Sequence, residues 1–161
     1  MPPPQILDVS TVDCDRILYS REQIYESLPQ RFEFSQLDAI VHLDRDTLII
    51  AGYRDIRDDE WWCRGHLPQK PIFPGVLMLE TAAQLAGFFR EIVVPSDDFL
   101  GFGGVDLAKF RIAVVPPARV ILIGRAIETR KRRFVCEIQA FVDATMAFEG
   151  TITGIPFELR T

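Results

Sequence analysis

The sequence GHLPQKPIFPGVLMLETAAQLAGFF, residues 65–89, joins a proline-rich half to a helix-forming half. Pro68, Pro71 and Pro74 each fix their own φ and restrict the residue before them, so the first half is stiff. From about Val76 onward the residues are good helix formers with no β-branched run. Because they are apolar nearly all the way round, we expect this helix to be buried at the centre of the fold.

Two polar side chains interrupt this apolar helix. Glu80 and Gln84 are four residues apart, which places them on one face. A glutamate rarely enters an apolar core without a partner or a chemical role. Gly75 precedes the helix and leaves backbone amides open at its start, where negative charge is stabilised. His66 lies fourteen positions before Glu80, in the stiff half. These four residues are the candidate functional residues.

The same residues resemble the active-site motif of the 3-hydroxyacyl-acyl carrier protein dehydratases, the FabZ family, whose pattern reads roughly G-H-F-P-x-x-P-I/V-F/M-P-G-V-L-x-L/I/V-E-x-M/L-A-Q. The matching positions are Gly65, His66, Pro68, Pro71, Phe73, Pro74, Gly75, Val76, Leu77, Glu80, Ala83 and Gln84. Weaker similarity extends over residues 28–40 and 105–120. The resemblance implies an α+β structure, the hotdog fold, in which a curved antiparallel sheet wraps around one long central helix.

The resemblance also implies an activity, the dehydration of a 3-hydroxyacyl thioester on acyl carrier protein to the trans-2-enoyl thioester. This reaction needs a base for the α-proton, a donor for the thioester oxygen and an acid for the departing hydroxyl. His66, whose ordinary pKa is close to neutrality, suits the base. The amide of Gly75 suits the oxyanion, and Glu80 suits the acid, because burial raises the pKa of a carboxyl group.

Each of these residues also has a structural interpretation. Gln84 is predicted to orient Glu80 through a hydrogen bond, although an amide at a helix interface fits its position nearly as well. Glu80 could instead be held in a buried ion pair with Arg111 or Arg31. His66 alone fits a histidine that holds the proline-rich loop, and it is the complete motif that favours the catalytic interpretation.

Five apolar side chains are candidates for the acyl pocket: Trp61, Trp62, Leu67, Phe73 and Phe88. Leu67 stands where the family usually has Phe, and the two tryptophans stand where it usually has a Phe pair. We therefore expect these positions to shape the pocket and the choice of substrate, although tryptophans more often belong to the core.

Positive charge is concentrated at one place in a chain whose net charge is −5. This is a run of four basic residues: Arg130, Lys131, Arg132 and Arg133. Acyl carrier proteins are strongly acidic, so this run is a candidate docking site for the carrier. A charge run at the tip of a hairpin is also commonly a solvated turn.

The chain of 161 residues is 48% hydrophobic, which suits one domain with a sizeable core. We expect residues 1–20 to form an N-terminal arm and residues 21–161 a single hotdog domain. The negative net charge argues against nucleic acid as a partner, and the absence of a signal peptide or a membrane-length apolar run predicts a cytoplasmic protein. Three cysteines without paired spacing and two histidines predict no disulfide and no metal site. The resemblance to the dehydratases implies that no cofactor is needed.

The elements around the central helix follow from local patterns. Residues 21–28 read as a short helix with Ser20 as N-cap, ended by Pro29. Alternating apolar residues predict a hairpin of strands 37–43 and 47–53. After the central helix, strands are predicted at 99–115, 119–129, 133–142 and 146–155, with a bend near 101–104.

The resemblance implies a homodimer with a shared site, in which His66 of one subunit meets Glu80 of the partner subunit, and a trimer of dimers is a family expectation. A helix that is apolar on nearly every side has more surface than one curved sheet covers, which favours a symmetric copy. Strand 47–53 or the strand near Phe99 is the expected edge for that contact. Two alternatives remain: a hotdog thioesterase, which typically lacks the His-Pro-Pro-Gly frame, and a non-catalytic hotdog protein that binds acyl groups or scaffolds a complex.

Overall fold

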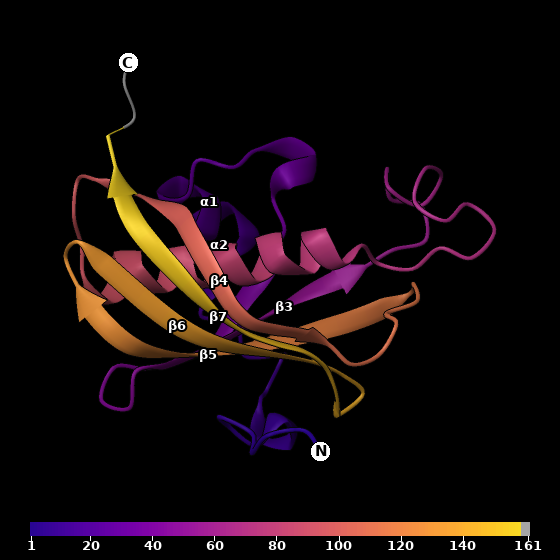
Figure 1. Cartoon of the computed structure of the whole chain (residues 1–161), viewed down its shortest axis with the longest axis horizontal. Helices are drawn as coiled ribbons and strands as arrows, with labels where there is room; N and C mark the ends of the chain where they lie inside the picture. Colours follow the sequence, from indigo (N-terminus) through magenta and orange to yellow (C-terminus); the bar gives the residue numbers. More distant parts are fainter. Residues whose placement is uncertain (159–161) are drawn as a thin grey trace.

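The computed structural model describes residues 1–158, which form a seven-stranded antiparallel sheet and two α-helices (Figure 1). The strands are β1 (Tyr19–Ser20), β2 (Ala39–Asp44), β3 (Ile49–Ile56), β4 (Phe99–Phe110), β5 (Ala118–Arg130), β6 (Arg133–Val142) and β7 (Thr145–Phe157). The helices are α1 (Arg21–Ser27) and α2 (Gly75–Val93), with short 3-10 turns η1 (Val9–Thr11) and η2 (Phe32–Phe34). The sheet curves around α2, which confirms the predicted α+β architecture.

Helix α1 begins and ends as its sequence predicts. The Ser20 hydroxyl accepts a hydrogen bond from the Gln23 amide at 3.3 Å, and the Gln23 side chain accepts one from the Ser20 amide at 2.9 Å. This reciprocal capping box satisfies two amides that the first turn leaves free. The helix ends at Ser27, two residues before Pro29, and it buries Ile24 and Tyr25.

Helix α2 supplies the centre of the core. Pro74 precedes it, and the Pro74 carbonyl accepts from the amides of Leu77 and Met78 at 2.9 and 3.1 Å. Its apolar side chains meet those of the sheet in one cluster, which includes Leu77, Leu85, Phe88, Phe89, Leu122, Phe134, Ile138 and Phe148. Each fully buried Leu or Phe stabilises the fold by about 1.5–3 kcal/mol, so this contact holds α2 against the concave face of the sheet.

The strand order β1-β2-β3-β5-β6-β7-β4 corrects one prediction about the edges of the sheet. The hairpin of β2 and β3 is present, but β3 also pairs with β5 along its whole length, so the strand predicted at 47–53 is interior. The long edge is β4, since the other edge strand, β1, has two residues. The ladder of β4 shifts register between Phe102 and Gly104, where the bend was predicted.

The N-terminal arm lies against the face of the sheet opposite α2 (Figure 1). Val9 packs there with Ala51, Ile123, Phe141 and Met146. The Gln139 side chain also ties the arm down, accepting from the Ile6 amide at 2.9 Å and donating to the Pro4 carbonyl at 3.0 Å. The arm therefore covers apolar residues on the outer face of the sheet, while the inner face is covered by α2.

The cysteines Cys14, Cys63 and Cys136 are all unpaired. No helix within residues 1–158 is both long enough and apolar enough to cross a membrane.

Candidate active site

His66 lies in the loop between β3 and α2, and its ring is held in one orientation. Its amide donates to the Trp62 carbonyl at 2.8 Å, and its Nδ1 lies 3.0 Å from the Ile72 carbonyl oxygen. A carbonyl oxygen can only accept, so Nδ1 carries the hydrogen in this contact. In the neutral ring Nε2 is then unprotonated, which is the state that a general base requires.

A cavity of about 380 Å³ lies beside His66 at the start of α2. Its lining includes Ile72, Phe73, Gly75, Met78, Phe110 and Val114. The first turn of a helix has no intrahelical acceptor for its first amides, so the Gly75 and Val76 amides are available to an oxyanion. A Cβ on Gly75 would lie 3.1 Å from the Phe110 ring, so the glycine lets Phe110 close one wall of the cavity.

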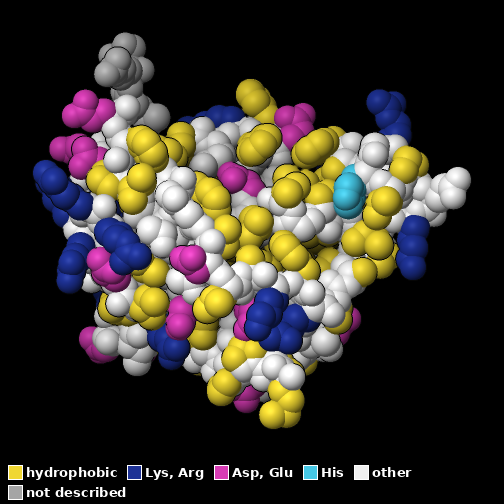
Figure 2. All heavy atoms as spheres, viewed as in Figure 1, with side chains coloured by type: hydrophobic (Ala, Val, Ile, Leu, Met, Phe, Trp, Pro, Cys, Tyr) yellow, Lys and Arg dark blue, Asp and Glu magenta, His cyan; other side chains and the backbone are white. Residues whose placement is uncertain are grey.

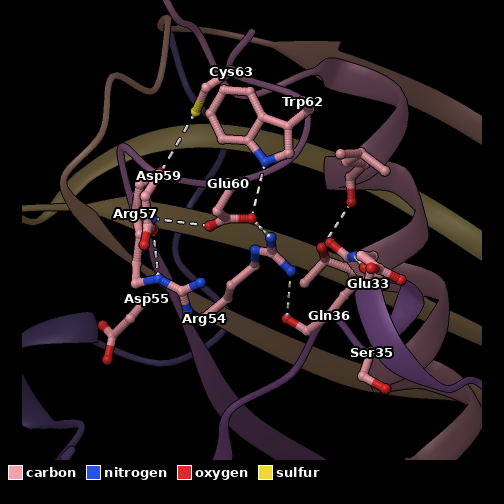
Figure 3. A network of polar contacts seen from close by, with 12 residues as sticks. Glu33, Ser35, Gln36, Arg54, Asp55, Arg57, Asp59, Glu60, Trp62 and Cys63 are labelled. Carbon is pink, nitrogen blue, oxygen red and sulfur yellow. Dashed lines mark hydrogen bonds and ion pairs between the residues drawn. The ribbon is translucent and has the colours of Figure 1, made fainter. Parts of the chain in front are cut away.

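Glu60 organises the loop that carries His66 (Figure 3). Its carboxylate pairs with Arg54 and accepts from the Trp62 indole nitrogen and the Arg57 amide, each at 2.9 Å. Arg54 and Glu60 are both buried, and burial lowers the pKa of the Arg54 guanidinium while the Glu60 charge opposes that shift. Because Trp62 in turn accepts from the His66 amide, Glu60 fixes the loop that positions His66.

Replacing Glu60 with Ala is expected to lower the free energy of unfolding by about 3–5 kcal/mol, because Arg54 would stay buried without its carboxylate. Urea unfolding followed by tryptophan fluorescence measures the loss. Asp59→Ala is the matched control, since it removes a neighbouring carboxylate that pairs with Arg57 in solvent. Equal losses for the two variants would contradict the role given to Glu60.

Glu80 and Gln84 are joined by the hydrogen bond that their spacing predicts. Gln84 Nε2 donates to Glu80 Oε1 at 2.7 Å, and Gln84 is buried while Glu80 is half-buried. No arginine within residues 1–158 forms an ion pair with Glu80. Arg111 pairs with Glu149, and Arg31 donates to the carbonyls of residues 28 and 30. The alternative of a buried ion pair for Glu80 is therefore wrong within this chain.

One chain does not bring His66 and Glu80 together. Each helical residue advances about 100° around the axis, so Glu80 points about 200° away from Met78, which lines the His66 cavity. Glu80 instead lies on the face of α2 whose next polar residue, Gln84, contacts Tyr25 and the segment 34–36. Glu80 and the His66 cavity therefore lie against different faces of α2.

Of the five acyl-pocket candidates, only Phe73 lines the His66 cavity. Trp62 is 2% exposed and packs edge-to-face on Phe73 at 5.6 Å, whereas Trp61 is 55% exposed and lines a separate groove with Arg54 and Glu60. Leu67 is exposed, in a left-handed backbone conformation with φ 52°. Phe88 is buried further along α2, edge-to-face with Tyr19 at 5.1 Å.

The basic run forms the turn between β5 and β6. Arg130 and Arg133 both pair with Glu128, and Lys131 and Arg132 line a groove with Asp98 and Phe157. In Figure 1 this turn and the loop between β3 and α2 lie at opposite ends of the molecule. Strand β4 runs between these ends, from Phe99 beside Phe157 to Phe110 in the His66 cavity, a path of about 35 Å along the curved strand.

No group of three or more His, Cys, Asp or Glu side chains in the described part of the chain is arranged to hold a metal ion.

Structures of similar shape define the class of this protein as a hotdog protein. The dehydratase heterocomplex ApeI:P from Xenorhabdus doucetiae matches with a TM-score of 0.70 at 15% identity, covering 84% of this chain and 91% of that chain. A mutant of the thioesterase PA1618 from Pseudomonas aeruginosa matches with a TM-score of 0.65 at 16% identity, covering 88% and 98%. At these identities the likeness establishes the fold alone.

Sequence comparison places the chain within one family of that class. The family model of the FabA-like domain matches residues 28–151. The 3-hydroxyacyl-acyl-carrier-protein dehydratase FabZ of Sorangium cellulosum is 35% identical over 131 residues, covering 80% of this chain and 84% of that protein. The FabZ of Campylobacter lari is 36% identical over 138 residues, covering 83% and 94%. The chain belongs to the FabA-like family.

Proposed function

We propose that the protein removes water from a 3-hydroxyacyl group, held as a thioester on acyl carrier protein, and yields the trans-2-enoyl thioester. The curated FabZ relatives support this reaction. The observation that carries it is the shared cavity of His66 and the start of α2 at Gly75, with His66 Nδ1 occupied by the Ile72 carbonyl. The proposal requires no metal or cofactor and keeps the cytoplasm as the compartment.

In this mechanism His66 Nε2 takes a proton from C2 of the acyl chain. The electron pair of that C–H bond delocalises onto the thioester oxygen, which the Gly75 amide stabilises as negative charge develops. The C2–C3 double bond then forms as the C3–O bond breaks, and the departing hydroxyl takes a proton from Glu80 to leave as water. Transfer of the proton from His66 back to Glu80, directly or through solvent, restores both groups.

The acid in this mechanism comes from a second copy of the chain. Glu80 and the His66 cavity lie against different faces of α2, so we propose that Glu80 of the partner subunit completes the cavity of each His66. The edge strand β4 supports such a dimer, because it is twelve residues long and exposes Phe102, Leu107 and Phe110. Val76 at the start of α2 is also 73% exposed. Figure 2 shows hydrophobic side chains gathered on the face where α2 and β4 lie.

One assay separates this function from the two alternatives. The purified protein is incubated with 3-hydroxyacyl carriers of several chain lengths, and ultraviolet absorbance follows the conjugated enoyl thioester while a thiol reagent follows release of the carrier thiol. Enoyl thioester without free thiol supports the dehydratase. Free thiol would indicate a thioesterase, and neither product across the panel would indicate a non-catalytic binding protein.

The docking site of the carrier is tested with paired charge reversals. Arg130 and Arg133 both pair with Glu128, so Lys131→Glu with Arg132→Glu reverses the two cations of the β5–β6 turn for which the described residues show no ion pair. If the carrier docks there, KM for the carrier-bound substrate is expected to rise about tenfold and its salt dependence to flatten, with KM for a carrier-free thioester unchanged.

The matched control reverses two exposed cations beside His66, Arg64→Glu with Lys70→Glu. The β5–β6 turn and His66 of the same chain lie near opposite ends of β4, so this comparison decides between the two ends of the molecule. A larger rise in KM for the control pair would move the docking site to the His66 loop and leave the β5–β6 run as a solvated turn.

A further inference from the structure

Tyr25 of helix α1 is connected to the candidate acid Glu80 by hydrogen bonds through Gln84. The Tyr25 hydroxyl donates to Gln84 Oε1 at 2.6 Å, and the Leu37 amide donates to the Tyr25 oxygen at 2.8 Å. A backbone amide can only donate, so the Tyr25 oxygen accepts from Leu37 and directs its own hydrogen to Gln84. The hydrogen bonds therefore run in one direction, from Leu37 through Tyr25 to Gln84.

The orientation of the Gln84 amide is fixed at both ends. The Gln36 amide donates to Gln84 Oε1 at 3.0 Å, which requires an oxygen at that position. Gln84 Nε2 donates to the Phe34 carbonyl at 2.7 Å, which requires a nitrogen there. The second hydrogen on Nε2 is therefore directed to Glu80 Oε1, also at 2.7 Å. The Gln84 amide therefore accepts two hydrogen bonds at Oε1 and donates two from Nε2. Rotating the amide by about 180° would place donor against donor and acceptor against acceptor, and would leave buried groups unpaired.

This arrangement distinguishes the two oxygens of Glu80. Oε1 accepts from Gln84, whereas Oε2 has no hydrogen-bond partner within residues 1–158. A carboxylic acid has one carbonyl oxygen and one hydroxyl oxygen, so this bond favours Oε1 as the accepting oxygen and leaves Oε2 to carry a proton toward a substrate. Burial raises the pKa of the Tyr25 phenol to about 12, so Tyr25 remains a donor throughout the neutral range. Arg21, whose guanidinium lies 5.7 Å from the centre of the Tyr25 ring, is paired with Asp38.

We propose that Tyr25 is a positioning residue for the dehydration, because its hydroxyl fixes the Gln84 amide that holds Glu80 Oε1 and leaves Oε2 to protonate the departing hydroxyl. This inference rests on the proposed function. Tyr25 lies in α1, outside the residues 28–151 that match the FabA-like domain. The N-terminal helix thus contributes to the site without touching the substrate.

The test measures Tyr25→Phe, Gln84→Met and their double variant with the carrier-bound substrate. Tyr25→Phe is expected to lower kcat about tenfold, the effect of one buried hydrogen bond, with KM within about twofold of the wild type. Because Tyr25 acts through Gln84, adding Tyr25→Phe to Gln84→Met is expected to cause no further loss. Tyr19→Phe is the matched control: it removes the same atom from a neighbouring tyrosine and is expected to leave kcat unchanged.

Three results would overturn the proposal: equal kcat for Tyr25→Phe and Tyr19→Phe, additive losses in the double variant, or a rise in KM in place of the fall in kcat. Should Tyr25→Phe fail to fold, Gln84→Glu carries the test. Its carboxylate still accepts from Tyr25 and Gln36 but cannot donate to Glu80 while ionised, so kcat is expected to fall more than tenfold. An unchanged kcat in that variant would overturn the proposal that Gln84 positions Glu80. Activity of the wild type in the same assay separates failure of this inference from failure of the proposed function.

Discussion

Replacing His66 with Ala is expected to lower kcat by about 10²- to 10⁴-fold, the usual effect of removing a general base. The side chain is exposed and its ring makes one hydrogen bond, to the Ile72 carbonyl, so the melting temperature is expected to stay near that of the wild type. The loss should appear in kcat and in kcat/KM alike, because the base acts only as the transition state forms. Steady-state formation of the enoyl thioester measures it.

His42 provides the matched control for this substitution. It is the other histidine of the chain and lies half-buried on β2, so His42→Ala makes the same change outside the cavity. Its kcat is expected to remain within about twofold of the wild type. If His66→Ala kept near-native turnover, His66 would be a structural residue of the loop and the proposed base would have to be found elsewhere.

Local chemistry explains how much of the fold could be predicted. In the sequence, Ser20 and Gln23 indicate the start of α1, and the run of helix formers after Pro74 predicts α2. Both signals depend on neighbouring residues only. The edge of the sheet could not be assigned in this way. Strand β3 pairs with β5, about seventy residues further along the chain, and this pairing follows from packing around α2 rather than from the sequence of either strand.

The candidate site was predictable where its residues form a motif and not where distant residues meet. The link between Glu80 and Gln84 follows from helical spacing, but the Tyr25 hydroxyl reaches Gln84 across fifty-nine residues. Glu60 is one of several acids before the tryptophan pair, and only burial distinguishes it from exposed Asp59. That burial also separates the two tryptophans, because Trp62 gives its indole hydrogen to Glu60 while Trp61 faces solvent.

The separation of Glu80 from the His66 cavity within one chain predicts that activity returns when two inactive variants form mixed dimers. If the partner subunit supplies Glu80 to each His66 cavity, neither single variant has an intact pair, but a mixed dimer has one. His66→Ala and Glu80→Ala proteins are each expected to be nearly inactive. After equal mixing and complete exchange of subunits, half of the dimers are mixed and each has one intact site, so about a quarter of the wild-type activity is expected to return.

A second mixture distinguishes sites shared between two subunits from sites completed within one chain. When wild-type protein is exchanged with the double variant His66→Ala, Glu80→Ala, a shared site leaves only the wild-type dimers active, about a quarter of all sites. Sites completed within one chain would instead leave about half of them active. Tagged subunits and native mass spectrometry verify that exchange is complete. No recovery in the first mixture together with half activity in the second would mean that each chain supplies its own Glu80, and α2 would then have to rotate to bring that carboxyl group to His66.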